Sequence, residues 1–300
     1  MKEVKGILCA LVTPLLPDES VDTEAVKRIV RHVDAGGTHG YLVLGSTGEQ
    51  IALNREAKKA MVTTVKACIP EDKPLLVGCG ATSTKLAIQN CLDAQQWGAD
   101  AVIVTPPCFY PFDEDGLVKY FTEISEETEI PVYLYNISRF TKCKITANVV
   151  KRLLDNPKIC GIKESDRDET LVQEILEVSR CRKDFVVIQG SDRIFLKSFR
   201  WGCQAGVTVV GNLVPNIAPA IYNAFKNGQQ EVAEALQQKL LDWVGVVTAL
   251  GKFPQELKTL MSWEGLCTAQ MTSPYIPLTA EMEQNLKSKL DEFYTKYGKE

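Results

Sequence analysis

The chain has 300 residues, of which 45% are hydrophobic and 24% are charged, so it is long and apolar enough to bury a large core. Its net charge of −4 and its lack of a Lys/Arg block exclude nucleic acid and membrane surfaces as its main partners. The N-terminal apolar run is too short for a membrane span and lacks the layout of a signal peptide. We therefore expect a cytoplasmic protein that acts on small molecules.

Cysteine and histidine usage predicts neither a disulfide framework nor a metal site. The ten cysteines are scattered with no C-x-x-C pair, which is typical of reduced cysteines in a core. The two histidines, His32 and His39, lie in one short segment and match neither a zinc site nor a Ser-His-Asp arrangement. We expect both to be structural.

Short apolar runs recur along the chain at a nearly constant interval, and segments with helical periodicity lie between them. The predicted strands lie within 7–13, 41–47, 74–80, 101–107, 131–137, 159–165, 185–191 and 206–212. The clearest predicted helices are 55–69, 84–98, 115–128, 147–155 and 169–181.

The continuous hydrophobicity of these runs predicts a parallel sheet that is covered on both faces. Eight β/α units in succession favour an α/β fold of the (β/α)8 TIM-barrel type, and no G-x-G-x-x-G motif supports a dinucleotide-binding sheet. We predict a catalytic barrel over 1–228. Residues 229–300 read as three more helices, which form a C-terminal helical extension packed on the barrel.

Polar residues follow the predicted strands at their carboxyl ends, where barrels of this kind carry out their chemistry. A glycine-rich turn exposes amides that can hold a carboxylate, and a phenol can relay protons. Each feature also has a plain structural explanation: an ordinary turn, a core tyrosine, or a lysine that reaches water. The features are "GSTGE" (45–49), Tyr135 with Asn136, Lys163, "GSD" (190–192) and "GN" (211–212).

The chain carries these motifs together and in one order, and in this it resembles the dihydrodipicolinate synthase and N-acetylneuraminate lyase family of pyruvate-dependent class I aldolases. The resemblance spans nearly the whole chain and rests on "GILCALVTPL", "GSTGE", "VTPP", "YLYN", "GIKES" and "GSD". The interval of 28 residues from Tyr135 to Lys163 is also typical of the family.

The resemblance implies that Lys163 forms a Schiff base with pyruvate, that Tyr135 and Thr47 relay protons, and that no other cofactor or metal is needed. A lysine amine attacks a ketone only in its neutral form, and an apolar strand end favours that form. The substrate-binding positions that it implies are Ser46, Thr47, Gly48, Arg139, Phe140, Ser165, Gly190, Asp192, Val207 and Thr208. The aldehyde partner is the second small-molecule substrate.

The chain departs from the family pattern where the second substrate binds. The synthases carry an arginine at the position of Phe140, and here Arg139 stands one residue earlier. The lyases carry a second acid at the position of Arg193 and a serine at that of Val209. A 2-keto-3-deoxy sugar acid or a similar 2-oxo acid is therefore the expected substrate. The alternatives are condensation of pyruvate with aspartate semialdehyde, as in dihydrodipicolinate synthase, and a non-catalytic barrel that binds an oxo acid.

The family resemblance also implies a homotetramer built as a dimer of dimers. In the synthases, a tyrosine crosses the tight interface into the neighbouring site. Here Cys108 occupies that position, followed by Phe109 and Tyr110. We expect this aromatic segment to form the tight interface.

Overall fold

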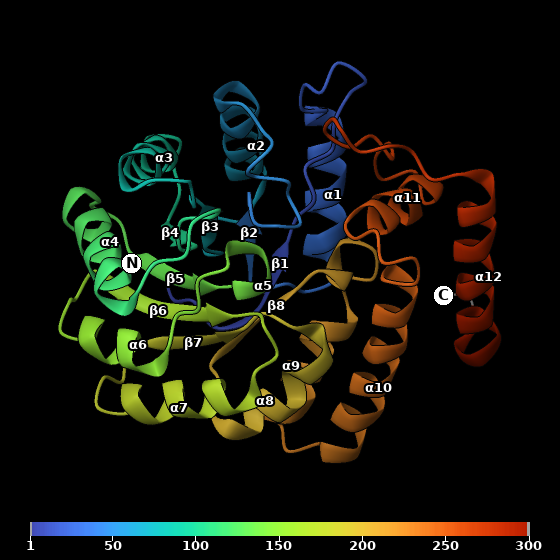
Figure 1. Ribbon diagram of the computed structural model, residues 1–300. Helices are drawn as coiled ribbons and strands as arrows, with labels where there is room; N and C mark the ends of the chain where they lie inside the picture. The colour runs from blue at the N-terminus through green and yellow to red at the C-terminus, as the bar shows by residue number, and fades with distance from the viewer. Residues whose placement is uncertain (1, 299–300) are drawn as a thin grey trace.

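The computed structural model describes residues 2–298 and shows eight parallel strands closed into one barrel, with neighbours paired in chain order (Figure 1). This confirms the predicted TIM barrel. The strands are β1 Gly6–Ala10, β2 Gly40–Val43, β3 Leu75–Gly78, β4 Ala101–Val104, β5 Val132–Asn136, β6 Ile159–Glu164, β7 Val186–Gln189 and β8 Ala205–Thr208.

Successive strand residues alternate between two apolar layers. Leu8, Leu42 and Ile103 belong to the cluster inside the barrel, whereas Ile7 and Tyr41 pack in the cluster between the strands and the helices. Both layers are almost completely buried. Continuous apolar runs fit this environment because neither face of a strand meets water.

Helices surround the barrel, and most begin at a polar side chain that accepts a hydrogen bond from an amide of the first turn. Asn54 caps α2 in this way, Asp113 caps α4 and Asp168 caps α7. The barrel helices are α1 Thr23–Ala35, α2 Arg55–Cys68, α3 Thr84–Gln96, α4 Glu114–Glu127, α5 Ser138–Thr141, α6 Ala147–Leu153, α7 Glu169–Ser179, α8 Phe195–Trp201 and α9 Ile217–Lys226. All five predicted helices are present, with ends that differ by one or two residues.

Three further helices follow the barrel: α10 Gln230–Val247, α11 Gln255–Trp263 and α12 Ala280–Tyr297 (Figure 1). The Gln237 amide on α10 donates to the Asp192 carbonyl at 2.9 Å, and its oxygen accepts from the Leu196 amide at 3.0 Å. Trp243 and Phe293 pack α10 against α12, with ring centroids 4.2 Å apart. The extension is thus bound to the barrel, while a boundary between residues 228 and 229 remains a prediction.

A buried ion pair fixes the extension to the turn after β2. Lys258 Nζ of α11 lies 2.9 Å from Glu49 Oε1 and also donates to the Thr13 carbonyl at 2.8 Å. Glu49 Oε2 accepts from both the amide and the hydroxyl of Thr272 at 2.9 Å. Because both charged side chains are buried, the pair constrains the turn that carries Ser46 and Thr47.

The histidines occupy structural positions, as predicted. His39 Nδ1 accepts from the Ile7 amide at 3.1 Å, and His32 Nε2 lies 3.0 Å from the Leu213 carbonyl. All ten cysteines are free. Residues 2–298 contain no group of three or more His, Cys, Asp or Glu side chains arranged to hold a metal ion. Among these described residues, no helix combines the length and apolar character that a membrane crossing requires.

Candidate active site

Lys163 and Tyr135 face each other at the carboxyl ends of neighbouring strands. They are register partners on β6 and β5, and Lys163 Nζ lies 3.9 Å from the centroid of the Tyr135 ring. Lys163 is only 4% exposed and Tyr135 only 3%. A lysine held inside an apolar barrel is a candidate nucleophile, since lysine is rarely buried without a specific role.

The phenol of Tyr135 is more acidic than a free phenol. Burial alone would raise its pKa, but the charge of Lys163 and hydrogen bonds with Lys163, Ser46 and Ser165 outweigh burial and lower the pKa. The Tyr135 hydroxyl lies 3.3 Å from Ser46 Oγ. Proton transfer from this phenol is thereby made easier.

The turn after β2 presents two free backbone donors beside Tyr135. Gly48 and Gln50 donate their amides to the Gly45 carbonyl, whereas within residues 2–298 the amides of Ser46 and Thr47 make no hydrogen bond. A Cβ on Gly48 would lie 3.1 Å from the Leu44 amide nitrogen, so a larger residue would push the turn apart. Two adjacent amides with no internal acceptor suit a carboxylate.

Ser165 and Gly190 line the opposite side of Lys163. A Cβ on Gly190 would lie 1.9 Å from Ser165 Oγ and 2.9 Å from Lys163 Cε. Only glycine therefore lets β7 approach the lysine this closely. Ser165 Oγ lies 3.5 Å from the Gly190 carbonyl and contributes to the hydrogen bonding of Tyr135.

Asp192 and Thr208 are bonded to each other. The Thr208 hydroxyl donates to one oxygen of the Asp192 carboxylate, and the Val209 amide donates to the other at 3.1 Å. Burial raises the pKa of Asp192 to about 6, against these hydrogen bonds and the charge of Lys163. The pair thus holds the turn after β7 against β8. That Asp192 and Thr208 contact the substrate remains a prediction. Val207 is fully buried in the cluster inside the barrel.

Arg139 and Phe140 lie on α5, at the outer rim of the site. Arg139 Nη1 donates to the Ser165 carbonyl at 2.6 Å, lies 3.5 Å from Asp166 Oδ1, and its guanidinium carbon is 4.9 Å from the Phe140 ring centroid. Phe140 is 57% exposed. The arginine is therefore occupied at the rim, and an apolar ring stands beside it.

A cavity of about 430 Å³ opens next to Tyr135 and Ser46. Most of its lining is apolar, with Leu44, Ile51, Ile103, Cys108, Ile137 and Phe140 from the barrel and Phe253, Pro254 and Tyr275 from the C-terminal extension. Phe109 and Tyr110 do not line it. They are 78% and 67% exposed, and their rings pack edge to face with centroids 4.9 Å apart.

A buried polar layer supports the two facing residues. The sequence pattern singled out Asn136 without a role and did not single out Glu164. The Asn136 amide donates to Glu164 Oε1 at 3.2 Å and its oxygen accepts from the Ile145 amide at 2.9 Å. The Asp166 amide donates to both oxygens of Glu164 at 2.9 Å. Burial raises the pKa of Glu164 to about 7 despite these bonds. Asn136 and Glu164 directly follow Tyr135 and Lys163, which is the signal that could have identified them.

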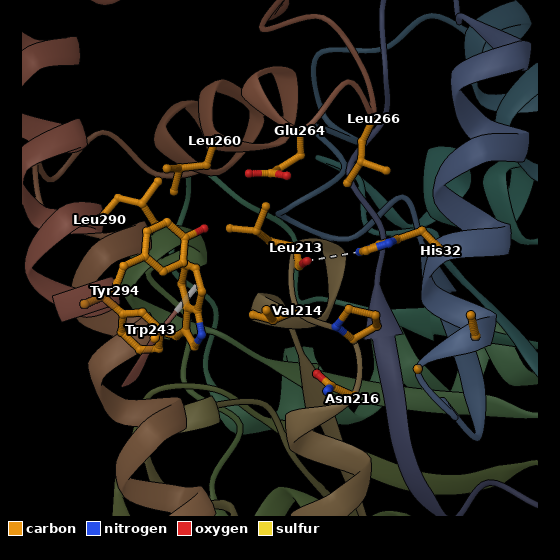
Figure 2. A pocket seen from close by; sticks show the side chains of 15 residues that line it. His32, Leu213, Val214, Asn216, Trp243, Leu260, Glu264, Leu266, Leu290 and Tyr294 are labelled. Atoms are coloured by element: carbon orange, nitrogen blue, oxygen red, sulfur yellow. Dashed lines mark hydrogen bonds between the residues drawn. The ribbon is translucent and has the colours of Figure 1, made fainter. Parts of the chain in front are cut away.

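A second cavity, of about 450 Å³, lies between α1 and the three C-terminal helices, as Figure 2 shows. His32, Trp243, Glu264 and Tyr294 point into it (Figure 2). None of its lining residues belongs to a barrel strand. The first cavity is therefore the one that belongs to the candidate active site.

The closed barrel with a buried lysine on β6 and a facing tyrosine on β5 has the layout of a barrel enzyme. The model of the Dihydrodipicolinate synthetase family matches residues 3–293, and the chain belongs to this family. The protein is accordingly an enzyme, a pyruvate-dependent aldolase or lyase of class I. Family membership argues against the non-catalytic alternative.

Curated relatives match over almost the whole chain. A 4-hydroxy-tetrahydrodipicolinate synthase of Methanothrix thermoacetophila is 31% identical over 286 residues, which cover 95% of this chain and 96% of the relative. An uncharacterised DapA-like lyase of Pyrococcus horikoshii is 31% identical over 263 residues, covering 87% of this chain and 91% of the relative. Of these two names, only the first identifies a reaction.

Solved structures agree with the fold. The 4-hydroxy-tetrahydrodipicolinate synthase of Methylacidiphilum fumariolicum superimposes with a TM-score of 0.91 at 26% identity, covering 98% of each chain. YagE, a prophage protein of E. coli K12 solved in complex with pyruvate, gives a TM-score of 0.91 at 25% identity, covering 96% of this chain and 98% of that protein.

Proposed function

We propose that Lys163 forms a Schiff base with pyruvate and that the enzyme makes or cleaves a carbon–carbon bond between pyruvate and an aldehyde. The observation that carries this proposal is the contact of Lys163 Nζ with the Tyr135 ring at 3.9 Å, beside a turn with two free amides. The amides of Ser46 and Thr47 would hold the pyruvate carboxylate. Its keto carbon would then face the lysine.

The reaction begins when Lys163 gives its proton to a base and the neutral amine attacks the keto carbon of pyruvate. Tyr135 and Thr47 relay protons as the carbinolamine forms and its hydroxyl leaves as water. Loss of a proton from the pyruvate methyl group converts the iminium into an enamine, which attacks the aldehyde carbon. Water then hydrolyses the product iminium and frees Lys163. The reverse sequence cleaves a 2-oxo acid into pyruvate and an aldehyde.

In the cleavage direction, the substrate that we favour is a 2-keto-3-deoxy sugar acid or a similar 2-oxo acid. Phe140 puts an apolar ring where the synthases have an arginine, and Arg139 is held by the Ser165 carbonyl. Aspartate semialdehyde would therefore lack its expected cation.

The alternative is a 4-hydroxy-tetrahydrodipicolinate synthase. Its support is the name of several relatives, together with the place of Arg139 at the rim of the site. If Arg139 binds the carboxylate of aspartate semialdehyde, its substitution by alanine will abolish that condensation.

The homotetramer and the tight interface belong to the same proposal. Phe109 and Tyr110 are exposed beside an apolar cavity, and exposed aromatic side chains are enriched in protein interfaces. We expect the segment 108–112 of one subunit to cover the cavity of its partner. Light scattering at micromolar concentration would contradict this if it gave a monomer of 33.3 kDa. The cytoplasmic location stays a prediction.

The test of the substrate is a screen for pyruvate released or consumed. The panel contains 2-keto-3-deoxy acids, N-acetylneuraminate, and aspartate semialdehyde with pyruvate. We expect turnover of a 2-keto-3-deoxy acid and weak use of aspartate semialdehyde. Efficient condensation with aspartate semialdehyde that Arg139→Ala abolishes would overturn the substrate assignment and leave the Schiff-base step intact.

A further inference from the structure

Three arginines lie on neighbouring loops at the mouth of the barrel. Arg139 is on α5 after β5, Arg167 follows β6, and Arg193 lies in the 3-10 turn Asp192–Ile194 after β7. Strands β5, β6 and β7 are adjacent in the barrel. The three cations therefore stand at one side of the mouth, next to Ser165 and Gly190.

Most cations near this side have an acidic partner. Arg139 pairs with Asp166 at 3.5 Å, and Lys197 of α8 pairs with Glu169 of α7 at 2.5 Å. Lys144 likewise pairs with Asp168 at 2.8 Å.

Arg167 and Arg193 differ from these paired cations. Within residues 2–298, neither forms an ion pair or a hydrogen bond. Arg193 is half-buried, and Arg167 is exposed.

The arginines also repel one another. Arg167 is exposed overall, yet partial burial of its guanidinium, followed by the charges of Arg193 and Arg139, lowers its pKa. These like charges oppose the arrangement in the absence of a ligand. An anion bound between the guanidinium groups would offset the repulsion.

We propose that Arg167 and Arg193 bind an anionic group, a phosphate or a carboxylate, at the end of the aldehyde remote from the reacting carbon. This inference rests on the proposed function, because it extends the substrate from Lys163 past Ser165 and Gly190 to the rim. Guanidinium groups bind both anions through paired hydrogen bonds. The 2-oxo acid that the enzyme cleaves then carries a second negative charge at its far end.

The same cluster disfavours aspartate semialdehyde. The carboxylate of that aldehyde sits on the carbon that also carries its ammonium group. Binding the carboxylate at Arg167 and Arg193 would bring the ammonium against two unpaired cations. An anionic aldehyde without an amino group avoids this repulsion.

The test compares aldehydes in matched pairs for condensation with pyruvate. One pair is glyceraldehyde 3-phosphate and glyceraldehyde, and the other is succinic semialdehyde and butanal. The variant is Arg167→Gln combined with Arg193→Gln. The control is Arg180→Gln, which removes one positive charge at the far end of α7, where Arg180 pairs with the exposed Glu177. Trapping of pyruvate on the lysine by borohydride is measured in every protein.

We expect kcat/KM of the wild type to favour the anionic member of at least one pair by about ten-fold or more. In the double variant, the ratio of kcat/KM for the anionic aldehyde to kcat/KM for the neutral aldehyde should fall by about ten-fold. Added salt should also reduce this ratio, and the control should retain it. Preference in the phosphate pair alone identifies a phosphate, and preference in the other pair alone identifies a carboxylate.

The inference would be overturned if kcat/KM of the wild type were equal for the anionic and neutral aldehydes in both pairs, or if the double variant did not change their ratio. If pyruvate is still trapped in that case, the proposed function stands. Absence of trapping in the wild type would overturn both.

Discussion

Lys258→Met tests how strongly the C-terminal extension is tied to the active-site turn. The substitution removes a fully buried cation and leaves the Glu49 carboxylate buried with only the two hydrogen bonds from Thr272. It also leaves the Thr13 carbonyl without the Lys258 donor. Breaking one side of a buried ion pair costs about 3–5 kcal/mol of unfolding free energy. In a chain of this size, that lowers Tm by roughly 5–8 °C.

The assay is urea and thermal unfolding, with pyruvate kinetics as a second readout. KM for pyruvate should rise, because Glu49 follows the amides of Ser46 and Thr47 in the same turn. The control is Lys197→Met, which removes one partner of an exposed pair and should cost about 1 kcal/mol or less. Glu49→Gln added to Lys258→Met should recover part of the loss. The reasoning fails if Lys258→Met destabilises the protein no more than the control does.

Other substitutions test single elements of the site. Tyr135→Phe should lower kcat by about 100-fold or more, because it removes the phenol that relays protons, and steady-state kinetics would contradict this if kcat stayed within ten-fold. Phe140→Arg should raise kcat/KM for aspartate semialdehyde by about ten-fold or more, and no gain would show that this position does not set the preference. Burial raises the folded-state pKa of Glu164 to about 7, above its ordinary 4.5, so the fold favours the protonated carboxyl. Its contribution to the free energy of unfolding is therefore fully present below pH 4.5 and is lost as the pH rises to about 7. Glu164→Gln should remove about 3 kcal/mol of that pH dependence, measured as urea midpoints from pH 4.5 to 7.5; an identical profile in the variant would refute the cause.

The barrel could be predicted because its signals are local. Each strand is a continuous apolar run, and the predicted helices such as α2 have a helical periodicity of apolar residues. Glycines at the strand ends could be recognised as turn residues. The reason why only glycine fits there lies in contacts with residues far away in the sequence. Gly190, for instance, must leave room for Ser165 and Lys163.

The rest of the site could not be predicted because it depends on contacts between distant segments. Lys258 meets Glu49 across 209 positions in sequence, and a lysine in an amphipathic helix ordinarily faces water. Phe253 and Tyr275 reach the cavity beside Tyr135 from the extension, which the sequence presents only as three more helices. The lack of partners for Arg167 and Arg193 is likewise a fact about the folded loops.

The most direct test of the central claim is trapping with pyruvate and borohydride, followed by intact-mass analysis and peptide mapping. We expect one reduced pyruvyl group, an increase of about 72 Da, on Lys163 and none in Lys163→Ala. An unlabelled wild type, or an adduct on any other lysine, would contradict it.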